Sequence, residues 1–93
     1  MAVSIRIPTI LRTYTGDASE VTVEPTEPTL AGVIEALEAT APGISARILD
    51  ESGQLRRFVN IYVDDDDVRF TDGLATPVGE RSSVSIIPAV AGG

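Results

Sequence analysis

The feature that most constrains the fold of this chain is one amphipathic segment. It lies between two groups of short stretches in which apolar and polar residues alternate. Apolar residues recur there at the i, i+3, i+4 and i+7 positions of one helical face, as Leu30, Val33, Ile34 and Leu37. Thr29 stands where an N-cap is expected, and Pro42 and Gly43 are expected to end the helix. Glu35 and Glu38 are expected to face water. The pattern predicts one helix with an apolar stripe that must cover a sheet.

Stretches of alternating apolar and polar residues predict β-strands on both sides of this helix. The predicted strands cover residues 3–7, 21–23, 58–63, 68–70 and 84–87, and a short helical turn is predicted at 44–49. This order predicts an α+β chain of β-grasp architecture, with a mixed sheet packed against one main helix and the first strand parallel to the last. The length of 93 residues predicts one domain, residues 1–88, and a flexible Gly-Gly tail, residues 89–93.

The charge and the missing residue types exclude several function classes. The chain has no cysteine, histidine or tryptophan, so disulfides, Cys/His metal sites and imidazole catalysis are excluded. The net charge of −7 disfavours nucleic acid and anionic membranes as partners. No apolar run approaches the ~18 residues of a membrane helix. We therefore expect a cytoplasmic protein that is a monomer when free and docks on basic protein surfaces.

A run of four aspartates, Asp64 to Asp67, invites a comparison with metal sites, because hard cations prefer carboxylate ligands. An EF-hand loop that began at Asp64 would place Arg69 where glycine is required and Ala75 where the last glutamate is required. We therefore expect a solvated turn there, no metal site, and a short strand from Val68 to Phe70.

The chain ends with Gly92 and Gly93, which follow the last predicted strand. Without a Cβ, a Gly-Gly end is thin enough to enter a narrow enzyme channel. Pro88 has no N–H and is expected to end the ladder, which leaves an extension of roughly 16 to 18 Å at about 3.3 to 3.6 Å per residue. Entry into a partner's active site would require the residues before the terminus, which are Ala89, Val90, Ala91 and Gly92. The alternative is a frayed, glycine-rich terminus.

Alternation places three larger residues on the sheet face opposite the helix, namely Phe58, Tyr62 and Ile87. A contiguous apolar patch beside a free tail would suit a partner enzyme, so we expect these residues to form a docking surface. Scattered apolar surface residues are the alternative.

The chain resembles, over its whole length, the ubiquitin-like sulfur carriers related to MoaD and ThiS, and is most similar to the CysO-type carriers of actinobacteria. The segments that carry the resemblance are Ile7-Pro8-Thr9-Ile10-Leu11-Arg12, Arg57-Phe58-Val59-Asn60-Ile61-Tyr62-Val63, Val68-Arg69-Phe70, Gly73-Leu74-Ala75-Thr76 and Ile87-Pro88-Ala89-Val90-Ala91-Gly92-Gly93.

The resemblance implies a carrier, and not an enzyme. An E1-like enzyme would use ATP to adenylate the Gly93 carboxylate, and a sulfur donor would displace AMP to leave a thiocarboxylate. No cofactor would be bound by the chain itself. In CysO-like systems the acceptor is a cysteine synthase and a zinc metalloprotease releases the cysteine adduct, whereas related carriers serve thiosugar, thiazole or molybdopterin pathways. A ubiquitin-like modifier joined to lysines and a non-covalent β-grasp interaction module remain as alternatives.

Overall fold

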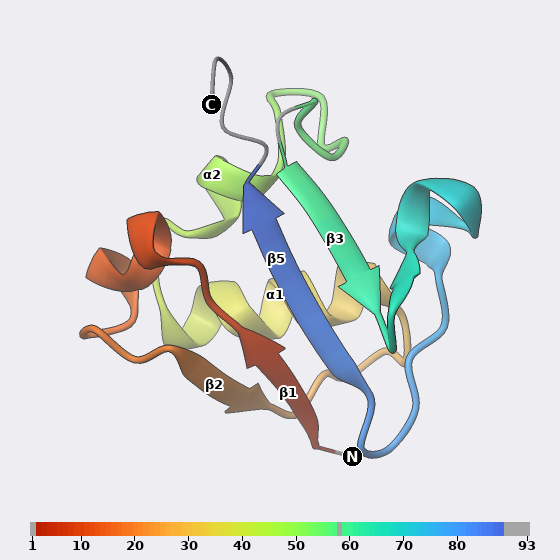
Figure 1. Ribbon diagram of the computed structural model, residues 1–93, viewed down its shortest axis with the longest axis horizontal. Helices are drawn as coiled ribbons and strands as arrows, with labels where there is room; N and C mark the ends of the chain where they lie inside the picture. Colours follow the sequence, from red (N-terminus) through yellow and green to blue (C-terminus); the bar gives the residue numbers. More distant parts are fainter. Residues whose placement is uncertain (1, 58, 89–93) are drawn as a thin grey trace.

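The computed structural model describes residues 2–57 and 59–88, which form a mixed sheet with a helix across one face (Figure 1). The strand order is β2-β1-β5-β3-β4. β1 and β5 are parallel, whereas β1–β2, β3–β5 and β3–β4 are antiparallel. The strand bounds are Val3–Arg6 (β1), Glu20–Val23 (β2), Val59–Val63 (β3), Asp66–Asp67 (β4) and Ser83–Pro88 (β5). The predicted β-grasp architecture, with the first strand parallel to the last, is confirmed.

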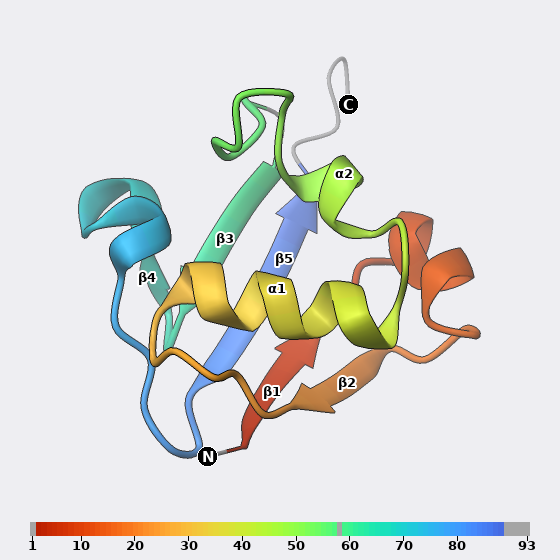
Figure 2. The ribbon, with the colours of Figure 1, turned by 180° about the vertical axis from the view of Figure 1, so that it is seen from behind.

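Helix α1 (Leu30–Thr40) crosses the back of the sheet (Figure 2). The predicted N-cap is present, because Thr29 Oγ1 accepts a hydrogen bond of 3.2 Å from the Gly32 N–H. A side chain at Gly32 would collide with the Glu27 carbonyl oxygen, so the helix lies against the connection from β2. All four residues of the predicted apolar face are buried, as are Val59, Ile61 and Val63 of β3. The helix and the inner sheet face therefore share one core.

Glu38 does more than face water, contrary to the sequence expectation. Its half-buried side chain accepts hydrogen bonds from the backbone N–H groups of Gly43 (2.8 Å) and Ser45 (2.9 Å). These bonds favour the carboxylate and lower the pKa of Glu38 from its ordinary value. Glu38 thereby links the end of α1 to the predicted short helical turn, α2 (Ser45–Ile48).

The strand predicted for residues 68–70 is wrong. Val68–Phe70 is a 3-10 helix, η2, because the Asp67 carboxylate accepts a bond of 2.9 Å from the Arg69 N–H and caps its start. The expected four-residue aspartate turn is shorter as well. Asp64 and Asp65 have φ of 50° and 75°, the positive pair that a type I′ hairpin turn requires. The last two aspartates of the run are the strand β4 instead.

Two more 3-10 helices were not predicted: η1 (Thr9–Tyr14) follows β1, and η3 (Gly73–Ala75) lies between η2 and β5. η1 forms part of the connection between β1 and β2. Within residues 2–57 and 59–88, no helix is long and apolar enough to span a bilayer.

Candidate docking surface at the end of the last strand

The last strand, β5, precedes the predicted tail. β5 is held on both sides, by Ile5 and its neighbours in β1 and by β3, where Val59 is the partner of Pro88. The C-terminal end of β5 and the start of β3 meet at one end of the sheet, where α2 also lies (Figures 1 and 2). The predicted tail residues, 89–93, lie outside the described residues. The structure fixes the position of Pro88, the residue that precedes them.

The open face of the sheet, opposite α1, carries two of the three predicted docking residues. Val84 and Ile86 of β5 are buried under the helix, so the alternate residue Ile87 faces outward and is 48% exposed. Ile87 is the cross-strand partner of Asn60, and Ser85 is the partner of Tyr62. Ile87 and the half-buried Tyr62 are therefore diagonal neighbours, within reach of an aromatic ring. The third, Phe58, lies outside the described residues.

Arg69 lies beside this surface, and sequence reasoning gave it no role. Its Nη1 donates to Asn60 Oδ1 (2.7 Å). Its Nη2 donates to the backbone carbonyls of Val59 (2.8 Å), Arg57 (2.9 Å) and Arg56 (3.1 Å). The guanidinium on η2 thus fixes the chain where it enters β3, next to the last residues of β5. The only signal in the sequence is that Arg69 falls in one of the resembling segments, because side chains that bind backbone carbonyls leave no periodic pattern.

Other side chains of the described residues are exposed as well, and the sequence did not single them out as docking residues. Ile10 of η1 is 65% exposed and Phe70 of η2 is 87% exposed. Arg6, Arg12 and Glu20 line a shallow hollow of about 270 Å³, where Arg12 Nε donates to the Ile7 carbonyl (3.1 Å). The exposed surface of the described residues therefore includes apolar side chains and charges of both signs.

The aspartate turn has a structural role, since the Asp64 carboxylate accepts bonds from the Ser83 N–H (2.9 Å) and the Ser82 hydroxyl (3.1 Å). Among residues 2–57 and 59–88, no group of three or more acidic, histidine or cysteine side chains could hold a metal ion.

Comparison with known proteins decides the family. The ThiS family model matches residues 5–93. This chain belongs to the ThiS family. It is 54% identical over 95 residues to the sulfur carrier protein CysO of Mycobacterium tuberculosis, with all of both chains covered. The crystal structure of the Amycolatopsis orientalis BexX/CysO complex contains a chain that is 45% identical, with a TM-score of 0.88 over 98% of this chain and 99% of that one. Small archaeal modifier protein 3 of Haloferax volcanii is 35% identical over 65 residues, which is 70% of each chain.

The family match has a direct bearing on the tail of this ThiS-family chain. It continues past the last described residue and includes the Gly-Gly end. The Mycobacterium tuberculosis relative is likewise aligned over its whole length. The Amycolatopsis orientalis structure is that of a complex of BexX with CysO.

Proposed function

We propose that this chain is a sulfur carrier protein whose Gly93 carboxylate is adenylated by an E1-like enzyme and converted to a thiocarboxylate. The observation that carries the proposal is the full-length 54% identity to a sulfur carrier, in a family match that ends at Gly93. In this scheme the chain is a substrate of other enzymes and catalyses no step itself. ATP is bound by the activating enzyme, and the chain holds no cofactor.

Activation is needed because a terminal carboxyl group, with a reference pKa of about 3.3 to 3.7, is ionised at neutral pH and resists nucleophiles. One oxygen of the Gly93 carboxylate attacks the α-phosphorus of ATP, which releases pyrophosphate and forms an acyl-adenylate. A sulfur nucleophile such as hydrosulfide then attacks the acyl carbon, and AMP leaves. The product is a thiocarboxylate at Gly93.

The tail and the open sheet face have separate tasks in this proposal. Ala89, Val90, Ala91 and Gly92 carry Gly93 into the active site of the partner. Ile87, Tyr62 and Phe58 supply apolar contact outside that site. Support comes from the position of Ile87, which is exposed one residue before Pro88, at the end of β5. A docked domain would then present its C-terminus over a short and defined reach.

The favoured sulfur acceptor is a cysteine synthase-like enzyme, with a zinc metalloprotease releasing the cysteine adduct. This choice follows from the similarity to CysO proteins. Thiosugar, thiazole or molybdopterin assembly are the other acceptor pathways. We place the chain in the cytoplasm, where ATP and these enzymes meet.

The test combines the purified chain with the activating enzyme of its host, ATP and sulfide. Intact mass should show one terminal oxygen replaced by sulfur, and pyrophosphate release should accompany it. Gly92→Val and a chain lacking Gly93 should fold normally but release no pyrophosphate, because a Cβ or a misplaced carboxylate blocks the reaction. Normal activation of either variant would contradict the role of the tail.

A second candidate is a protein modifier, which the 35% identity to small archaeal modifier protein 3 favours. The same adenylate would then form an amide with lysines of other proteins. This chain has no lysine, so it offers only its N-terminal amine for self-conjugation. If amide-linked conjugates accumulate while sulfide is in excess, the modifier replaces the carrier. Full function without Gly92 and Gly93 would instead indicate a non-covalent interaction module.

A further inference from the structure

The edge of the sheet farthest from β4 is formed by β2, and its outer side has no strand partner among the described residues. The Ile7 N–H donates to the Ser19 carbonyl (2.8 Å), whereas the Ser4 N–H points the other way, to Ser82 (3.2 Å). Hydrogen-bonded pairs alternate along an antiparallel ladder. Thr22, the partner of Ser4, therefore directs its N–H and C=O away from β1. This edge offers a donor and an acceptor to another extended chain.

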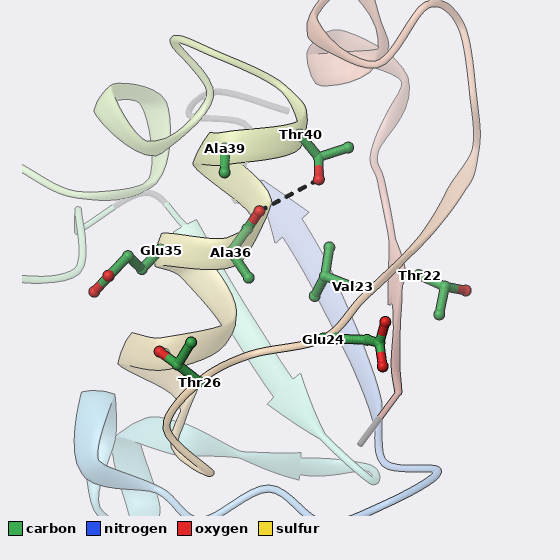
Figure 3. Close-up of a pocket in the computed structure, with 9 residues that line it drawn as sticks. Thr22, Val23, Glu24, Thr26, Glu35, Ala36, Ala39 and Thr40 are labelled. Atoms are coloured by element: carbon green, nitrogen blue, oxygen red, sulfur yellow. Dashed lines mark hydrogen bonds between the residues drawn. The ribbon is translucent and has the colours of Figure 1, made fainter.

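A groove of about 510 Å³ runs along the same edge, between β2 and α1 (Figure 3). Its helix wall includes three small residues, Gly32, Ala36 and Ala39, and Figure 3 shows Ala36 and Val23 on facing walls. The helix wall is fixed in place because Gly32 lies against the Glu27 carbonyl. The groove would therefore accommodate every second side chain of a strand added to β2, namely those that project toward α1.

The charge around this groove has one sign. Residues 20–40, which form β2, the connection after it and α1, contain five of the fourteen acidic residues and none of the seven arginines. Glu35 lines the groove and is exposed. A second copy of the chain would bring the same glutamates together, and each copy carries a net charge of −7. Complementarity therefore favours an occupant with positive charge.

We propose that the β2 edge and its groove bind an extended, basic peptide segment of a partner protein, which adds to the sheet as an antiparallel sixth strand. The inference is independent of Gly93 chemistry. Main-chain hydrogen bonds to Thr22 supply affinity, and alternate side chains supply specificity. The residue opposite Thr22 projects on the open face, next to Glu20, and its neighbours project into the groove. We therefore expect basic residues at the positions that project on the open face and mid-sized apolar residues at the positions that project into the groove.

The probe is a capped hexapeptide of alternating valine and arginine, titrated into the 15N-labelled full-length chain. Amide signals of Thr22 and its neighbours in β2 should shift, together with those of Gly32 and Ala36. Removal of Gly92 and Gly93 should leave the shifts unchanged, which separates this inference from the proposed carrier function. Shifts confined to Tyr62 and Ile87, or none at millimolar peptide, would overturn it.

Two N-methylated forms of the peptide test the strand geometry at equal charge. In the antiparallel arrangement the arginine amides face β2 and the valine amides face away. N-methylation of the arginines should abolish binding, whereas N-methylation of the valines should preserve it. A slip by one residue cannot rescue the first form, because it would exchange the two side-chain faces. Equal affinity of both forms would show simple charge attraction and refute strand addition.

Matched variants of the chain complete the test. Thr22→Pro removes the outward N–H without a loss to the β1 ladder and should weaken binding about fivefold, while Thr22→Val should bind normally. Glu35→Lys should weaken binding several-fold, and Glu51→Lys, with the same charge change on a remote loop, should not. Equal affinity of Thr22→Pro and Thr22→Val would count against the proposal. Concentration-dependent shifts of β2 without peptide would overturn it in favour of a second copy.

Discussion

Ile86 and Ile87 are adjacent in β5 but project to opposite faces of the sheet, so the same substitution at each should have different consequences. Ile86 is 4% exposed in the core, and Ile87 is 48% exposed on the open face. Truncation of a buried isoleucine to alanine costs about 2 to 5 kcal/mol of unfolding free energy. Ile86→Ala should therefore lower stability strongly and leave the docking surface unchanged.

For Ile87 the expected loss is divided between folding and docking. Complete burial of an aliphatic side chain is worth about 1.5 to 3 kcal/mol. Because roughly half of Ile87 is already covered in the free chain, a partner can gain about 1 kcal/mol by covering the rest. Ile87→Ala should then raise the dissociation constant for the activating enzyme about fivefold. Its stability should fall by about 1 kcal/mol, well below the loss for Ile86→Ala.

The assay pairs chemical denaturation with calorimetric titration of the activating enzyme, using the parent and both variants. Ile86→Val, with an expected cost of about 0.5 to 1.5 kcal/mol, serves as a folded control on the inner face. The reasoning is refuted if Ile87→Ala binds as tightly as the parent. It is also refuted if Ile86→Val weakens docking as much as Ile87→Ala does, because docking would then follow stability and not surface contact.

Three further predictions concern the frame of the domain. Gly32→Ala, normally favourable inside a helix, should lower the denaturation midpoint, because the new methyl group collides with the Glu27 carbonyl. The pKa of Glu38 is lowered in the folded state, so its contribution to stability is present above its ordinary pKa and is lost as the pH falls through the folded-state pKa. Glu38→Gln should therefore make the loss of stability in acid less steep, which denaturation at several pH values would measure. Arg69→Lys should lower the free energy of unfolding by about 1 to 3 kcal/mol and speed hydrogen exchange at the start of β3, because an ammonium group cannot replace the bonds of the planar guanidinium. Unchanged exchange there would contradict the role of Arg69 in holding the start of β3.

The regular elements could be predicted from the sequence because each buries one face, and burial imposes a period. Alternation found β1, β2, β3 and β5, and the four-residue apolar stripe found α1 with its N-cap. The 3-10 helices were not predicted because segments of three to six residues are too short to show a periodic pattern of apolar residues. Val68–Phe70 even imitates a strand, with Arg69 between two apolar residues, and only the Asp67 cap identifies the helical turn.

The candidate site was predicted only in part, for the same physical reason. Alternation correctly placed Tyr62 and Ile87 on the open face. It could not find Arg69, whose role depends on carbonyl groups brought together by the turn into β3. It could not find the β2 groove either, since the walls meet only when α1 packs across the sheet. Contacts between elements are invisible to a pattern within one element.

The two surfaces inferred for this chain lie on different strands, and this separation has a consequence for how it could work. Tyr62 and Ile87 belong to β3 and β5, whereas the peptide edge is β2, and β1 lies between β2 and β5. The strand that leads to the tail is bonded to β1 and β3 and shares no ladder with β2. A peptide added at β2 would therefore leave Ile87 and the end of β5 uncovered. One partner could hold the carrier through its edge while another reacts with its end, which a single shared surface would forbid.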